Sequence, residues 1–236
     1  MKKGLKTYFY LFIILALTIP VVIQYGGPSF LRSYVETGVG TCQNIPILCM
    51  APSETIAYSE PDKSFFEELI PHDFPKMGIS VPKGFALLQE TIKKVYYKKN
   101  KRGFADKVIY VLHEQPGFFT DLYPQVKKQG VPDNYEFIRR VMHASVSKII
   151  NLTDAFFVIM KGIFIPDVGD QHEVKMGRFE VDGKRGFINY NLNRKFFDCN
   201  LTNEVGGFFK VYIKDKDASL DLSQVIGIIT TIVDKN

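Results

Sequence analysis

The first hydrophobic segment of the chain lies at its amino terminus. Lysines at positions 2, 3 and 6 precede residues 7–31, which contain no charged side chain, and residues 8–25 form an apolar centre 18 residues long. A helix needs roughly 20 such residues to cross a bilayer, and positively charged flanks stay in the cytoplasm. Residues 1–27 are therefore predicted to form a cytoplasmic tip and a single-pass transmembrane signal anchor. The main domain would lie outside the cytoplasm, in the periplasm or at the cell surface.

A cleaved signal sequence is the alternative for this segment. Such a sequence has an apolar core of about 7–15 residues, followed by small residues at the cleavage site. Here the apolar run is longer, and its exit, "IQYGG", offers no small-x-small pattern. The pattern favours the uncleaved anchor.

Residues 28–77 show little sustained periodicity. Prolines recur at positions 28, 46, 52, 61, 71 and 75, which predicts a Pro-rich linker or lead-in. One short helix is expected in "EPDKSFFEELIP", where Asp62 or Ser64 can cap it and Phe65, Phe66 and Leu69 share a face.

From residue 78 onward the pattern changes to that of strands. "TIKKVYYKK" and "KVIYVLHEQ" flank a Gly-containing connection and predict a β-hairpin. "AFFVIMKGIFI", residues 155–165, has the pattern of a buried strand. In "GRFEVDGKRGFINYNL", the Asp182-Gly183 pair between alternating residues predicts a second hairpin, and "GGFFKVYIKD" predicts a further strand.

Two helices are expected among these strands. Residues 133–151 begin with Asp133 and carry Glu136 three positions later, a capping pair, and their apolar positions follow helical spacing. Residues 221–234 are ambiguous, because their β-branched content favours a strand. A continuous apolar face favours the helix instead.

Hairpins interrupted by helices predict an α+β domain over residues 78–236, with an antiparallel sheet and helices packed on one face. This order, the opening "ISVPKGF" and the closing "LDLSQVIGIITTIV" resemble the PsbP/Mog1-like superfamily. The resemblance implies a C-terminal helix packed on the sheet and a non-enzymatic binding or assembly module. Many members are accessory subunits of membrane complexes. The loop at residues 113–132 and the membrane anchor depart from the family pattern.

The three cysteines are Cys42, Cys49 and Cys199. Outside the cytoplasm disulfides are permitted, so Cys42 and Cys49 can close a small loop. Two independent thiols are the other interpretation. A zinc site is disfavoured by the spacing and by the lack of a His within twenty residues of the pair. Cys199 is expected to be a buried thiol that behaves as a small hydrophobic residue.

Composition adds one surface feature to this picture. The chain is 46% apolar and 23% charged with a net charge of +5, an ordinary globular balance that does not indicate nucleic acid. A basic cluster could face anionic lipid, an acidic polymer or an acidic partner, although lysines can also protect the edge of a solvated hairpin. The cluster comprises Lys93, Lys94, Lys98, Lys99, Lys101 and Arg102, interleaved with Tyr96 and Tyr97.

Recognisable catalytic chemistry is sparse. The sequence contains no nucleophile-elbow, metalloprotease or phosphate-loop motif, and the acidic loop at residues 166–173 lacks calcium-loop spacing. No catalytic, cofactor-binding or metal-binding residue is assigned. His113, Asp121 and His172 are kept as enzyme candidates, although His113 and its neighbour Glu114 would point to opposite faces of a strand.

The sequence therefore predicts a membrane-anchored, extracytoplasmic binding or accessory module. It would be a non-catalytic subunit or assembly factor of a membrane or envelope complex, with membrane or envelope proteins as partners. The alternative is an exported hydrolase whose site lies near residues 113–123, because a long Pro- and Gly-containing loop suits a site.

Overall fold

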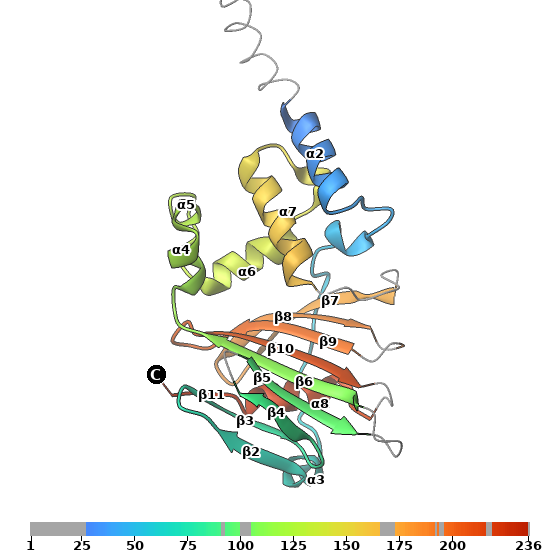
Figure 1. The fold of residues 1–236 in the computed structure, drawn as a ribbon, viewed down its shortest axis with the longest axis vertical. Coiled ribbons are helices and arrows are strands. Elements are labelled where there is room, and N and C mark those ends of the chain that lie inside the picture. The colour runs from blue at the N-terminus through green and yellow to red at the C-terminus, as the bar shows by residue number, and fades with distance from the viewer. Residues whose placement is uncertain are drawn as a thin grey trace, which may run out of the picture.

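The structure is a computed structural model that describes residues 27–90, 93–99, 105–165, 173–191, 193, 196–215 and 219–235. Its main feature is an eight-stranded sheet (Figure 1). All neighbouring strands run antiparallel except the first pair, which is parallel. In spatial order the strands are β1 (Glu54–Thr55), β7 (Lys175–Val181), β8 (Lys184–Asn191), β9 (Phe196–Thr202), β10 (Phe208–Asp215), β6 (Ala105–Glu114), β5 (Lys93–Lys99) and β4 (Ala86–Glu90).

A three-stranded sheet and a set of helices surround this main sheet. The small sheet has the order β11 (Val233–Asp234), β3 (Met77–Pro82) and β2 (Leu69–Asp73). The helices are α2 (Gly27–Gly38), α3 (Lys63–Glu67), α4 (Phe118–Leu122), α5 (Pro124–Lys127), α6 (Asn134–His143), α7 (Leu152–Phe164) and α8 (Leu222–Thr230), with 3₁₀ turns η2 (Pro46–Leu48) and η3 (Val146–Lys148).

Helices cover both faces of the main sheet, so the prediction that they pack on one face is wrong. Helices α4 to α7 lie on one face, whereas α8 and the small sheet lie on the other (Figure 1). Strand β10 shows the reason, because Phe208 packs toward α4–α7 and Phe209 toward α8. Successive strand residues point to opposite faces. A sheet that is apolar on both faces needs a layer on each. The broader prediction of a mixed α+β fold is confirmed.

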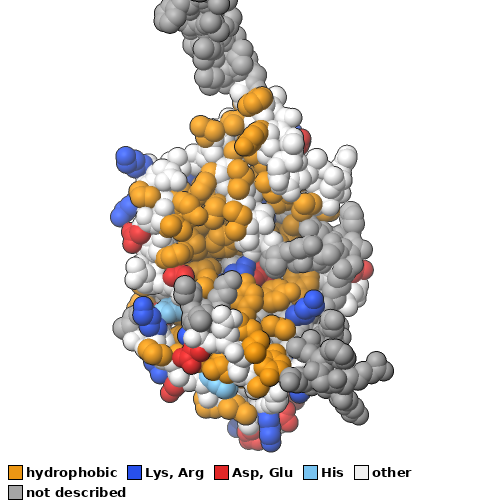
Figure 2. Space-filling view, viewed as in Figure 1, with side chains coloured by type: hydrophobic (Ala, Val, Ile, Leu, Met, Phe, Trp, Pro, Cys, Tyr) orange, Lys and Arg blue, Asp and Glu red, His pale blue; other side chains and the backbone are white. Residues whose placement is uncertain are grey.

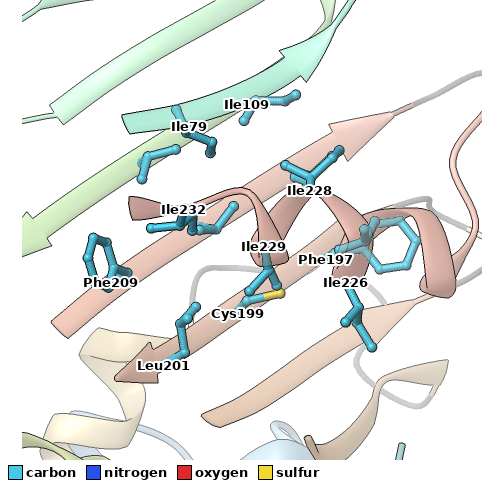
Figure 3. Packing of buried hydrophobic residues seen from close by; sticks show 14 of the residues in the cluster. Ile79, Ile109, Phe197, Cys199, Leu201, Phe209, Ile226, Ile228, Ile229 and Ile232 are labelled. Carbon is cyan, nitrogen blue, oxygen red and sulfur yellow. The ribbon is translucent and has the colours of Figure 1, made fainter. Parts of the chain in front are cut away.

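The C-terminal helix forms the centre of one core. Ile226, Ile228 and Ile229 of α8 are fully buried and pack against strand residues that include Phe197 and Leu201 (Figure 3). Helix α8 begins with a capping box. In this box the Asp221 carboxylate accepts a hydrogen bond from the Gln224 amide at 2.8 Å, and the Gln224 side chain accepts one from the Asp221 amide at 3.0 Å. The helix predicted for residues 221–234 is confirmed over Leu222–Thr230, but Val233–Asp234 form strand β11. Cys199 is also buried in this core with a free thiol, as expected.

Residues 155–165 form most of α7, so the prediction of a buried strand there is wrong. Asn151 caps the helix, because its side-chain oxygen accepts a hydrogen bond from the Asp154 amide at 2.9 Å. A short apolar run fits a buried helix and a buried strand equally well. The capping residue Asn151, just before α7, is the local signal that distinguishes the helix from a strand.

The short helix expected near Phe65 forms as α3, but the Asp62 side chain accepts no capping hydrogen bond from the described residues of α3, and Leu69 belongs to β2. Two other local predictions are confirmed, one of them with a shorter boundary. Asp133 caps α6 by accepting from the Glu136 amide at 2.8 Å, but α6 ends at His143 because Ala144 is extended. Asp182 and Gly183 have φ angles of 47° and 67°. These positive values are what a two-residue type I′ hairpin requires, and the turn joins β7 to β8.

Residues 27–77 are folded against the domain. Cys42 and Cys49 form a disulfide with their Cα atoms 5.5 Å apart, which confirms the bonded interpretation. The loop contains η2, which buries Ile47 and Leu48. Among the described residues, no helix has the length and apolar character needed to cross a membrane. The predicted transmembrane segment lies outside those residues.

Candidate functional site

The first candidate site is a cleft of about 380 Å³ around His113, near the end of β6. The His113 ring stacks on Phe209 with 4.6 Å between centroids. The described residues that line the cleft are Phe74, Pro75, Lys76, Met77, Lys94, His113 and Glu114. None of them carries a hydroxyl or a thiol, so this lining supplies no serine-, threonine- or cysteine-type nucleophile.

The Asp234 carboxylate lies beside the His113 imidazole, but Asp234 is not among the described residues that line the cleft. His113 Nε2 is 3.5 Å from Asp234 Oδ2, and each side chain is 8% exposed. Burial lowers the pKa of His113, although the Asp234 carboxylate acts in the opposite direction. Burial also raises the pKa of Glu114, against the effect of Lys76. A neutral imidazole oriented by a carboxylate is able to accept a proton. General-base chemistry is therefore the reaction this cleft can support.

Asp121, another enzyme candidate, does not join His113. Asp121 is exposed on α4. Phe119 of the same helix packs in the core on the opposite face of the main sheet from Phe209. His172 lies outside the described residues. Sequence reasoning missed Asp234, because its position depends on the pairing of β11 with β3, more than 150 residues away in the chain. No local pattern encodes that contact.

The basic cluster lies partly on an internal strand. Strand β5 pairs with β4 on one side and with β6 on the other, so the lysines of β5 do not protect a sheet edge. Lys94 Nζ lies 4.8 Å from the centroid of the Phe74 ring at the His113 cleft, and Tyr96 is completely buried. Lys98 lies beside Gly84. The side chains of Lys93 and Lys99, together with Lys101 and Arg102, lie outside the described residues. An anion-binding surface here stays a prediction.

A second candidate site is built on α7, whose one lysine points inward. Lys161 is 0% exposed. Its ammonium donates to the carbonyl oxygens of Met142 and Ala144, both at 2.9 Å, and of Met50 at 2.5 Å. Burial lowers the pKa of Lys161 to about 7. These bonds tie α7 to the end of α6 and to the segment after the disulfide, and so fix the rotation of α7 about its axis.

The opposite side of α7 is apolar. Leu152, Phe156, Ile159 and Ile163 follow one another at intervals of four, three and four residues, which places them on one side of the helix. Leu152 is 74% exposed and Ile163 is 69% exposed. A surface helix normally turns its polar side to water. Helix α7 departs from this pattern, because Lys161 is buried together with Phe157, Val158 and Met160, whereas Leu152 and Ile163 are exposed and Phe156 and Ile159 are half-buried.

Helix α4 and the residue after it extend this apolar area. The rings of Tyr123 and Phe156 meet edge to face with 5.2 Å between centroids, and Leu122 is 53% exposed. Figure 2 shows hydrophobic side chains gathered over this helical part of the molecule. We define the α4–α7 surface as Leu122, Tyr123, Leu152, Phe156, Ile159 and Ile163.

A buried polar cluster lies beneath the helices, on the main sheet. Lys210 Nζ is 3.0 Å from Asp198 Oδ1, and the amides of Asn189 and Asn200 donate to Asp198 Oδ2 at 3.4 and 3.2 Å. Asp198 and both asparagines are 0% exposed. The side-chain oxygens of Asn189 and Asn200 accept no hydrogen bond from the described residues. Because Asp198 and both asparagines are enclosed and Asp198 pairs with Lys210, we interpret the cluster as structural.

Neither metal-binding groups nor comparisons with known proteins identify a function. In the part of the chain that the structure describes, no three His, Cys, Asp or Glu side chains are grouped to hold a metal ion. The acidic loop at residues 166–173 falls almost wholly outside that part. The sequence matches no protein-family model and no curated protein. The PsbP/Mog1-like resemblance therefore stays an interpretation of element order and short sequence phrases.

Proposed function

We propose that the protein is a membrane-anchored, extracytoplasmic binding module that serves as a non-catalytic subunit or assembly factor of a membrane or envelope complex. The observation that carries this proposal is the α4–α7 surface. Contiguous exposed apolar areas on soluble domains mark interaction sites. Here the hydrogen bonds of Lys161 hold α7 in a rotation that leaves Leu152 and Ile163 exposed.

The geometry of α7 favours a helical partner. A single line of apolar residues at intervals of three and four is the pattern by which helices pack against one another or into a groove. Leu152 and Ile163 lie at the two ends of this line. The proposed occupant is therefore an apolar helix of another membrane or envelope protein.

The disulfide supports the proposed compartment. Disulfides persist in oxidising environments such as the periplasm and the cell surface, and they are rare in the cytoplasm. The Cys42–Cys49 bond lies between α2 and the main sheet. This position agrees with a domain that lies across the membrane from the lysines at the amino terminus.

Photo-crosslinking tests the partner surface directly. A photoreactive residue is placed at Ile163 of the full-length protein in its own membranes, and at Leu88 as a control. Leu88 is 65% exposed and lies on β4, away from the surface. We expect one recurring crosslinked protein from Ile163 and none from Leu88. Equal, diffuse crosslinking from both positions would contradict the proposal.

An exported hydrolase is the second candidate, because His113 lines a cleft and lies beside the Asp234 carboxylate. The purified full-length protein can be assayed on ester, amide and glycoside probes. The binding proposal predicts no turnover above background. Turnover that is abolished in a folded His113→Gln variant would establish the hydrolase instead.

A further inference from the structure

We propose that one end of the helical layer, formed by the starts of α2 and α7, lies in the lipid headgroup layer beside the anchor. This inference rests on the membrane anchoring in the proposed function. We define the membrane-end surface as Phe30, Tyr34 and Ile150; Leu152, two residues after Ile150, belongs to the α4–α7 surface. Its occupant is the bilayer itself, in contrast to the partner helix proposed for the length of α7.

The sequence connects α2 directly to the apolar amino-terminal segment. Residues 7–31 contain no charged side chain, and α2 begins at Gly27 within this stretch. The first charged residue of α2 is Arg32. The first turn of α2 therefore belongs to the part of the chain that would leave the membrane.

The exposure of hydrophobic side chains is greatest at this end. Phe30 and Ile150 are each 70% exposed and Leu152 is 74% exposed, the three largest values among the large hydrophobic side chains described. Helix α2 contacts both η3 and α7, and Leu31 packs in the same cluster as Ile149. Hydrophobic side chains lie where the chain enters the domain (Figure 2).

The residue types suit an interface between lipid and water. Phe30 and Tyr34 are four residues apart on α2 and so lie on one side of the helix. Aromatic residues are enriched at the headgroup level of membranes. Lys148 is exposed just before Ile150 and can approach anionic headgroups, whereas Arg32 pairs with Glu36 at 3.0 Å.

Tryptophan fluorescence can test this contact without background, because the chain contains no Trp. Full-length Phe30→Trp and Ile150→Trp variants are reconstituted into vesicles of phosphatidylcholine and phosphatidylglycerol. A matched set of vesicles contains lipid brominated near the headgroup end of its acyl chains. Leu88→Trp is the control, because Leu88 is 65% exposed on β4, away from α2 (Figure 1).

We expect emission at positions 30 and 150 to shift to the blue and to be quenched by brominated lipid, with no change at position 88. A second outcome is that the protein floats with the vesicles while Trp emission at positions 30 and 150 is neither shifted nor quenched, as at position 88. That result would refute the headgroup contact and leave the membrane anchor supported. Equal quenching at all three positions would also overturn it, because the contact would not be local. If the protein does not float, the anchor and the inference fail together.

Discussion

The burial of Lys161 predicts a pH dependence of stability that can be isolated by one substitution. Burial lowers the pKa of Lys161 from 10.5 to about 7. Below pH 7 the folded and unfolded states both hold the proton. Between pH 7 and 10.5 only the unfolded state holds it, so raising the pH favours the folded state.

The size of the change in unfolding free energy follows from the difference between the pKa of Lys161 in the unfolded and folded states. One pH unit corresponds to about 1.4 kcal/mol, so the span from about 7 to 10.5 corresponds to about 5 kcal/mol. This figure is an upper bound, because the carbonyl groups of Met50, Met142 and Ala144 favour the ammonium form with its three N–H donors.

The assay compares urea unfolding of the wild type and of Lys161→Met between pH 7 and 10. Methionine has a similar length but no titrating group. Other groups titrate in both proteins, including the Cys199 thiol, whose pKa is raised by burial. We expect the stability of the wild type to rise relative to the variant as pH increases. A constant difference would show that Lys161 reaches water, and it would refute the orientation of α7.

Three further outcomes are expected for stability. Ile229→Ala should lower the unfolding free energy by about 2–5 kcal/mol, because Ile229 is fully buried and its truncation leaves a cavity. Ile163→Ala, at a position that is 69% exposed, should change the unfolding free energy by less than about 0.5 kcal/mol. Equal effects of the two variants in denaturant unfolding would contradict the packing. Reduction of Cys42–Cys49, which closes a loop with a sequence separation of 7, should lower the unfolding free energy by about 2–3 kcal/mol, and an unchanged midpoint with reductant would argue against it. Asn151→Ala should cost about 1 kcal/mol through loss of the α7 cap, with Asn151→Asp as the control that keeps it.

Elements with local signals could be predicted from the sequence. The Asp182-Gly183 turn, the Asp133 cap and the helix after Asp221 each depend on residues within a few positions. Their chemistry fixes the backbone whatever packs around it. Asn151 is a local capping signal of the same kind for α7. The apolar run after it nevertheless favours a buried strand when only the sequence is considered.

Features that depend on distant contacts could not be predicted. The two-sided covering of the main sheet depends on where α8 returns, and the meeting of His113 with Asp234 depends on the β11–β3 pairing. The exposed side of α7 was also hidden in the sequence. A lysine in an apolar helix is expected to face water, whereas Lys161 finds three carbonyl acceptors inside.

Native mass spectrometry of the full-length protein, released gently from its own membranes, tests the central claim most directly. The samples are the wild type, Ile163→Asp on the α4–α7 surface and Leu88→Asp as an equally exposed control. The account predicts a hetero-oligomer with an intact amino terminus for the wild type and for Leu88→Asp, and a lone folded protein for Ile163→Asp. A wild-type protein that is released alone, or a complex that survives Ile163→Asp unchanged, would contradict it.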